Sequence, residues 1–259
     1  MIIAILGAGA YGTALGEILI KNGYSIRYYD PKFGRDDFID VINGAEMIMY
    51  VAPSGAAPEI LPKLPSDIPL VIASKGFLTE QPFSRFSNYM VFSGAGYADD
   101  IKAGSAANIT VTDRCLLELF KSSCLKLDFT TDRRGVLMCG ALKNVYAIMA
   151  GMRELERGTK EWLEYLDEAG QEIKSLLLAN GCNPDTFDLG CGRADLELTC
   201  GLPSRNYRYG LEIHNNLSKN SNDTVEGIIV LRKIKNGEIL VPQGLKILSD
   251  LLNKELLCH

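Results

Sequence analysis

A chain of 259 residues can bury one large hydrophobic core or two modest ones, and the usual size of a domain favours two. The hydrophobic fraction of 47% and the charged fraction of 23% are those of an ordinary globular protein, and the net charge of −5 offers no basic face to a nucleic-acid backbone. We therefore expect small molecules, including small anions held in a local positive pocket, and no nucleic acid among the partners.

Cysteine usage indicates the compartment. The seven cysteines form no CxxC pair and no signal sequence precedes the first apolar run, which favours a reducing cytoplasm. With two histidines and no clustered cysteine ligands, no protein metal site is expected. No apolar run approaches the length of a membrane span, so we expect no integral membrane segment.

The N-terminal residues read as strand, glycine-rich turn and helix, in that order. An apolar run over residues 2–6 predicts the strand, and GxGxxG follows at Gly7, Gly9 and Gly12. In this context Gly7 permits the tight turn, Gly9 lets a pyrophosphate approach the backbone, and Gly12 lets helix and strand pack closely. The helix N-terminus adds amide donors for the anion, so we predict a dinucleotide site. The alternative, a glycine-rich turn without a ligand, is disfavoured by the flanking strand and helix.

A second predicted strand, over residues 25–29, ends at Asp30, about 20 residues after the glycines. An acidic side chain in this place can accept hydrogen bonds from both ribose hydroxyls of the adenosine, and it repels a 2′-phosphate. Asp30 therefore favours NAD over NADP. Lys32 and Arg35 follow closely and could partly reverse that preference.

Strands and helices then alternate with right-handed crossovers up to about residue 131, with strands expected over residues 46–51, 70–73, 89–92, 106–112 and 125–130. Beyond that point the pattern is helical. We therefore predict an α/β Rossmann-type N-terminal domain over residues 1–131 and an all-α C-terminal domain over residues 132–259.

Two lysines need an explanation. Lys75 follows the strand of residues 70–73, where the side chain would point into the ligand crevice of an open α/β sheet; a solvated loop lysine is the alternative. Lys143 lies near the middle of an apolar, small-residue helix over residues 134–151. It could snorkel to the surface, or it could act as a partly desolvated acid or base in a cleft.

The C-terminal half contains a long amphipathic helix over residues 160–180, closed by Gly181, with Trp162 and Tyr165 expected at the margin of its buried side. That buried side is predicted to carry Leu163, Leu166, Ile173, Leu176 and Leu177.

Polar side chains gather between residues 195 and 206. Asp195 and Thr199 are four residues apart, hence on one helix face, and Ser204, Arg205 and Asn206 follow a proline as donors in a tight turn. Arg205 could hold a phosphate or carboxylate bidentately. Taken alone, Asp195 as a surface charge and Ser204 as a helix N-cap are the default interpretations.

Together these motifs resemble the NAD(P)-dependent glycerol-3-phosphate dehydrogenase family over most of the chain. The residues that carry the resemblance, in order, are Gly7 to Gly12, Pro53-Ser54, Lys75 to Phe77, Ser93-Gly94 to Ala98, Ala141 to Val145, Thr186-Phe187, Ala194 to Leu196 with Thr199-Cys200, and Ser204 to Asn206. The resemblance implies a two-domain, 6-phosphogluconate-dehydrogenase-like fold. It also implies reversible hydride transfer between NAD(P)H and dihydroxyacetone phosphate, giving sn-glycerol 3-phosphate.

The resemblance assigns roles residue by residue. It implies that Lys143 is the general acid/base, that Asp195 and Thr199 form a network with it, and that Lys75 lies beside the substrate. Arg205 would bind the substrate phosphate, with further substrate contacts from Asn144, Ser204 and Asn206. The implied cofactor contacts are Gly7, Gly9, Ala10, Tyr11, Gly12, Asp30, Pro53, Lys75, Ala98 and Arg205.

Two other functions stay open at this point. One is a related two-domain keto-acid reductase of the ketopantoate reductase kind, and the other is a non-catalytic NAD(H)-binding protein. The family also suggests a homodimer.

Overall fold

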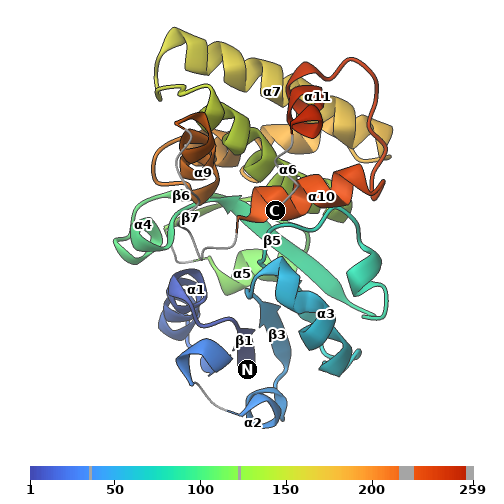
Figure 1. Cartoon of the computed structure of the whole chain (residues 1–259). Helices are drawn as coiled ribbons and strands as arrows, with labels where there is room; N and C mark the ends of the chain where they lie inside the picture. The colour runs from blue at the N-terminus through green and yellow to red at the C-terminus, as the bar shows by residue number, and fades with distance from the viewer. Residues whose placement is uncertain (35–36, 122–123, 216–224, 255–259) are drawn as a thin grey trace. The chain divides into compact units, whose positions relative to one another are not determined.

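The computed structural model describes residues 1–34, 37–121, 124–215 and 225–254, so Arg35 lies outside the described residues. The chain divides into two compact units: residues 1–75 with 80–133, and residues 76–79 with 134–259 (Figure 1). The first unit is a Rossmann-type α/β fold and the second is all-α, which confirms the predicted fold class. No sequence feature had indicated that Gly76–Thr79 would fall with the helical unit.

One seven-stranded sheet organises the first unit, with the strand order β2-β1-β3-β4-β5-β6-β7. The strands are β1 (Ile2–Leu6), β2 (Ser25–Tyr29), β3 (Met47–Tyr50), β4 (Leu70–Ile72), β5 (Tyr89–Ala95), β6 (Ala107–Val111) and β7 (Leu125–Phe129). The first five are parallel. Their carboxyl ends therefore lie along one edge of the sheet, where ligands bind in open α/β folds.

The direction of β6 contradicts the prediction that right-handed crossovers connect all the strands of this unit. β6 pairs antiparallel with β5, and β7 runs parallel to β6. The connection from β5 to β6 spans only residues 96–106 and contains the short helix α4 (Ala98–Lys102). A parallel crossover needs about a dozen residues or more, so the chain turns back instead.

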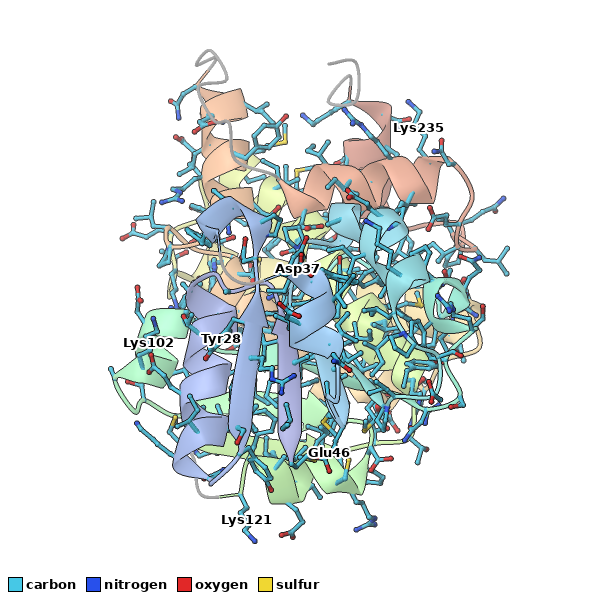
Figure 2. The ribbon with its side chains drawn as sticks, turned by 90° about the horizontal axis from the view of Figure 1, so that it is seen from below. Tyr28, Asp37, Glu46, Lys102, Lys121 and Lys235 are labelled. Atoms are coloured by element: carbon cyan, nitrogen blue, oxygen red, sulfur yellow. The ribbon has the colours of Figure 1, made fainter. Side chains whose placement is uncertain are left out.

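Helices cover the sheet as the alternating pattern requires. They are α1 (Ala10–Lys21), α2 (Phe38–Ile42), α3 (Ala57–Ile60), α4 and α5 (Arg114–Leu119), with 3-10 turns at Pro31–Phe33, Ser54–Ala56, Leu61–Lys63 and Gln81–Phe83. Ile3 and Ile5 face a core that includes Leu15 of α1, while Ala4 and Leu6, on the opposite face, are equally buried. Tyr28 of β2 lies against α1 (Figure 2), where a Cβ added at Gly16 would be 2.0 Å from its hydroxyl.

In the helical unit, the other helices pack around α6 (Arg133–Met152). They are α7 (Lys160–Ala179), α8 (Arg193–Thr199), α9 (Arg205–His214), α10 (Glu226–Lys235) and α11 (Lys246–Asn253), with a 3-10 turn at Pro184–Asp188. Among the described residues, α6 alone is long and apolar enough to cross a membrane, but 94% of its 18-residue apolar window is buried inside the protein. Every residue from Gly135 to Gly151 is buried, as in a central core helix.

Glycines bring two helices into backbone contact with α6. A Cβ added at Gly210 of α9 would be 2.0 Å from the Ile148 carbonyl oxygen, and one at Gly227 of α10 would be 2.6 Å from the Asn144 carbonyl oxygen. Conversely, a Cβ at Gly151 of α6 would be 2.0 Å from the Tyr207 carbonyl oxygen. These approaches leave no room for any side chain, so they fix the positions of α9 and α10 on α6.

The buried face of α7 differs from the prediction. Trp162 and Tyr165, expected at the margin, are 5% and 3% exposed, whereas Leu163 is 46% exposed. The buried face of α7 contains Leu166, Ile173 and both aromatic residues, whereas Leu163 lies outside that face in the first helical turn. Leu166, Ile173, Leu176 and Leu177 are buried as predicted, and the two aromatic side chains join them in the core.

Candidate active site

The glycine-rich turn after β1 has the geometry that a dinucleotide needs. Gly7 has φ +108°, and a Cβ there would be 2.6 Å from the Ala52 amide nitrogen. A Cβ at Gly12 would be 1.9 Å from the Gly7 carbonyl oxygen, so no side chain fits at either place. Gly9, in contrast, faces open space, with nothing within 4 Å of an added Cβ. Gly7 and Gly12 therefore serve the fold, and Gly9 leaves room for a ligand.

Asp30 joins this turn to the end of β2. Its Oδ2 accepts a hydrogen bond from the Ala8 amide at 2.8 Å, and its Oδ1 accepts one from the Lys32 amide at 3.0 Å. Helix α1 begins at Ala10 with Tyr11 in its first turn, and within the described residues its N-cap Gly9 gives no side-chain cap. The first-turn amides of α1 and the fixed carboxylate thus fit a pyrophosphate and an adenosine ribose respectively.

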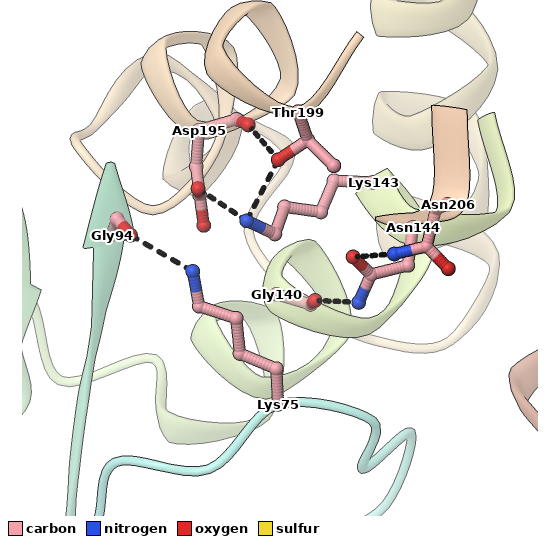
Figure 3. A network of polar contacts seen from close by, with 8 residues as sticks. All are labelled: Lys75, Gly94, Gly140, Lys143, Asn144, Asp195, Thr199 and Asn206. Carbon is pink, nitrogen blue, oxygen red and sulfur yellow. Dashed lines mark hydrogen bonds and ion pairs between the residues drawn. The ribbon is translucent and has the colours of Figure 1, made fainter. Parts of the chain in front are cut away.

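The remaining cofactor candidates of the first unit follow strand ends at the same edge. Pro53 follows β3 and precedes a 3-10 turn, and Ala98 is the first residue of α4, after β5. Lys75 follows β4, is partly buried, and donates a hydrogen bond from Nζ to the Gly94 carbonyl oxygen at 3.0 Å (Figure 3). The sheet therefore brings the glycine turn, Asp30, Pro53, Lys75 and Ala98 to one edge.

In the helical unit, Lys143 is buried and paired. It is 5% exposed and forms an ion pair with Asp195, which is fully buried (Figure 3). Its Nζ also donates to Thr199 Oγ1 at 2.9 Å, and Thr199 Oγ1 donates to the Asp195 carbonyl oxygen at 2.6 Å. Helix α8 presents both partners from one face, so the alternative in which Lys143 snorkels to the surface is wrong.

The ion pair explains how an ammonium can be buried here. An unpaired buried charge costs several kcal/mol, and the Asp195 carboxylate offsets that cost. The neighbouring Cys200 is fully buried, and burial raises the pKa of its thiol, although the charge of Lys143 acts in the opposite direction. Cys200 therefore remains a neutral thiol, and the chemistry of this cluster is that of the lysine.

Two asparagines connect three helices next to Lys143. Asn144 Nδ2 donates to the Gly140 carbonyl oxygen at 3.2 Å, and Asn206 Nδ2 donates to Asn144 Oδ1 at 2.9 Å (Figure 3). Asn206 Oδ1 accepts from the Gly227 amide, also at 2.9 Å. The two amides thereby tie α6, α9 and the start of α10 together.

Ser204 and Arg205 begin α9. Ser204 is its N-cap, and its Oγ accepts a hydrogen bond from the Tyr207 amide at 3.4 Å. Arg205 occupies the first helical position and its side chain is exposed, which leaves the guanidinium accessible to a ligand. The structure thus gives Ser204 the capping function of the default interpretation, and a substrate contact for it stays a prediction.

The sequence interpretation missed two charged residues that the structure singles out. Glu172 of α7 is 6% exposed and accepts hydrogen bonds from Tyr146 Oη at 3.0 Å and from the Ile247 and Leu248 amides at 2.8 and 3.1 Å. It therefore caps α11 from a distant part of the chain. Lys233 of α10 donates to the Gly76 carbonyl oxygen at 3.0 Å. Neither position carried a motif, so only the packing reveals them.

Known proteins resemble this chain in both sequence and fold. The family described as NAD-dependent glycerol-3-phosphate dehydrogenase C-terminus matches residues 132–245. The glycerol-3-phosphate dehydrogenase [NAD(P)+] of Nitratidesulfovibrio vulgaris is 30% identical over 262 residues, which cover 82% of this chain and 79% of that protein.

Solved structures agree on the fold. The crystal structure of glycerol-3-phosphate dehydrogenase from Coxiella burnetii superposes with a TM-score of 0.81 at 22% identity, covering 98% of this chain and 99% of that one. A ketopantoate reductase from Ralstonia eutropha superposes less well, with a TM-score of 0.59 at 16% identity over 97% of each chain. The chain thus belongs to the NAD(P)-dependent glycerol-3-phosphate dehydrogenase family and is an oxidoreductase that uses NAD(P).

Proposed function

We propose that this chain catalyses reversible hydride transfer between NAD(P)H and dihydroxyacetone phosphate, giving sn-glycerol 3-phosphate, with Lys143 as the general acid/base. The observation that carries the proposal is the buried Lys143–Asp195 pair with its Thr199 contact, in a chain of this family. Such an ammonium is a proton donor held in one orientation, which general acid catalysis requires.

The residues of this chain handle the proton. NAD(P)H, when bound, supplies the hydride that adds to the ketone carbon. Lys143 donates its proton to the ketone oxygen as negative charge develops there, and the resulting amine takes a proton from the alcohol in the reverse direction. Asp195 and Thr199 orient Nζ, and the cationic donor stabilises charge that is present only in the transition state.

Binding of the substrate is assigned to the residues around this lysine. Arg205, exposed at the start of α9, would hold the phosphate through its planar guanidinium. Within the described residues, Asn144 Nδ2 and Asn206 Nδ2 each donate to one acceptor, so each retains a second hydrogen for the substrate or cofactor. Lys75 would add a second positive charge beside the substrate.

We further propose NAD(H) as the preferred nucleotide. The Asp30 carboxylate is held at the end of β2 by two amides and cannot turn away without losing both hydrogen bonds. A 2′-phosphate would meet that fixed negative charge, whereas two ribose hydroxyls would donate to it.

The proposal is tested by mixing purified protein with dihydroxyacetone phosphate and either NADH or NADPH, and following the absorbance of the reduced nicotinamide. Lys143→Met should lower kcat by about 100-fold or more while NADH fluorescence still reports binding. Lys160→Met, at a lysine whose side chain is 82% exposed, is the matched control and should keep full activity. Tight NADH binding without turnover by the unaltered protein would instead indicate a non-catalytic nucleotide-binding protein.

The phosphate distinguishes the proposed substrate from an unphosphorylated keto acid. Arg205→Ala should raise the KM for dihydroxyacetone phosphate by about tenfold or more, because it removes a charge-assisted bidentate contact. The KM for ketopantoate, if that compound reacts at all, should change little. Faster turnover of ketopantoate than of dihydroxyacetone phosphate would favour the keto-acid reductase alternative.

A cytoplasmic location and a homodimer stay predictions. Exposed apolar side chains that could contribute to a subunit contact in the helical unit are Leu163, Leu178, Leu202 and Leu240. Light scattering on the purified protein measures the oligomeric state directly.

A further inference from the structure

We propose that Lys233 of α10 is a positioning residue for the reaction, which fixes the main chain that follows Lys75. This inference rests on the proposed function, in which Lys75 lies beside the substrate. The main observation behind it is a hydrogen bond of 3.0 Å from Lys233 Nζ to the carbonyl oxygen of Gly76, the residue that follows Lys75.

The contact is more than a chance surface bond. Lys233 is partly buried, and its Nζ also lies 5.5 Å from the centre of the Phe77 ring, within cation–π range. Phe77 and Leu78 are 2% and 1% exposed, so the segment Gly76–Thr79 is packed into the helical unit to which it belongs. Most lysines, by comparison, keep their ammonium in water.

Gly76 is the position where such a contact matters most. Its φ of +102° is a conformation that residues with side chains rarely adopt, and glycine has more main-chain freedom than any other residue. Without a partner, the Gly76–Phe77 peptide could rotate about the flexible main chain of Gly76, which would loosen the backbone directly after Lys75. A charged donor on its carbonyl oxygen restricts that rotation.

Helix α10 is itself fixed at its other end. Its second residue, Gly227, donates to Asn206 Oδ1 and packs against the Asn144 backbone, immediately after Lys143. Lys233 follows Gly227 by six helical steps, a rise of about 9 Å at 1.5 Å per residue. Within the helical unit, α10 thus contacts the α6 backbone next to Lys143 at its start and the Gly76 carbonyl oxygen near its end.

The side chain of Lys75 is held separately. Its Nζ donates to the Gly94 carbonyl oxygen, so the residue is restrained at its tip and, through Gly76, at its backbone. Loss of the Lys233 contact should free the backbone while leaving the tip attached, which changes the direction in which the ammonium is presented. A displacement of about 1 Å at a reacting group can cost up to about 100-fold in rate.

The test compares kcat and KM for dihydroxyacetone phosphate and NADH among Lys233→Met, Lys233→Arg and the control Lys235→Met. Lys235 is exposed at the end of the same helix (Figure 2). Lys233→Met should lower kcat/KM for dihydroxyacetone phosphate by about tenfold or more, with the KM for NADH and the melting temperature close to those of Lys235→Met. Lys233→Arg keeps a cationic donor and should recover part of the loss.

A double-mutant cycle shows whether the effect passes through Lys75. If it does, adding Lys233→Met to Lys75→Met should lower kcat/KM by less than about twofold, because the group it positions is already gone. The inference is wrong if Lys233→Met lowers kcat/KM equally in the unaltered and the Lys75→Met proteins, or does not lower it at all. In either case an unaltered enzyme that reduces dihydroxyacetone phosphate still supports the proposed function. Loss of activity together with a lowered melting temperature in both Lys233 variants also overturns the inference. An unaltered enzyme that does not reduce dihydroxyacetone phosphate overturns both.

Discussion

Replacing Asp195 by Asn should both destabilise the helical unit and abolish most activity. The change preserves side-chain shape and removes one charge, so Lys143 keeps a buried ammonium without its counter-ion. The two side chains are only 6% and 0% exposed, and removing one partner of a buried pair typically costs about 3–5 kcal/mol. The Thr199 hydroxyl still accepts a hydrogen bond from Lys143, so we expect the free energy of unfolding to fall by an amount near the lower end of that range, about 3 kcal/mol.

The only tryptophan provides the signal for that measurement. Trp162 is buried in α7, and its indole Nε1 donates to the Cys200 carbonyl oxygen at 2.7 Å, one residue after Thr199. Its fluorescence during urea unfolding therefore reports on the helical unit around the ion pair, separately from the sheet. The free energy of unfolding follows by linear extrapolation to zero urea.

The pair Lys143→Met and Asp195→Asn makes a double-mutant cycle. Each single variant leaves one buried charge alone, whereas the double variant leaves none, so the double variant should be more stable than either single one. All three should lower kcat by about 100-fold or more. An Asp195→Asn protein that unfolds at the same urea concentration as the unaltered protein would refute the reasoning, as would a double variant less stable than both singles.

Three further predictions concern other parts of the chain. Asp30→Gly should lower the preference for NADH over NADPH, measured as the ratio of the two kcat/KM values, by about tenfold or more because no carboxylate then opposes a 2′-phosphate. Glu172→Gln should lower the free energy of unfolding by about 1–2 kcal/mol, read from the same tryptophan signal, with kcat unchanged, because α11 loses its buried anionic cap. Cys115 is an exposed residue whose sulfur lies 3.3 Å from Met90 Sδ, and partial desolvation of that sulfur, together with the adjacent Asp113, raises the pKa of its thiol to about 12. Cys115 should therefore react slowly with a thiol reagent at neutral pH and faster once urea unfolds the chain; rapid labelling of Cys115 in the folded protein, located by mass spectrometry, would contradict this.

Local patterns were sufficient for most of the fold. The strand of residues 2–6, the three glycines and α1 form a continuous stretch whose structure depends on near neighbours, and it could be predicted in full. The direction of β6 could not, because periodicity shows that a strand exists and not which way it runs. The usable signal was the short connection over residues 96–106.

Long-range packing decided what could not be predicted. Asp195 and Thr199 were identified through their four-residue spacing and the family resemblance, and the structure places both against Lys143. Glu172 gave no such signal, because a single acid in an amphipathic helix is usually solvated, and its partners lie about residue 247. The contact of Lys233 with Gly76 joins positions 157 residues apart, beyond any local pattern.

The backbone contacts of α6 have a consequence for how this protein can change over evolution. At Gly151, Gly210 and Gly227 the main chains of neighbouring helices touch, and any side chain would clash there. The spacing of these helices is therefore set by main-chain atoms that every sequence shares. Exposed side chains on those helices, which make none of these contacts, can be exchanged without changing that spacing. A distant relative can thus lose most sequence identity and keep the geometry of the lysine, provided that it keeps these three glycines.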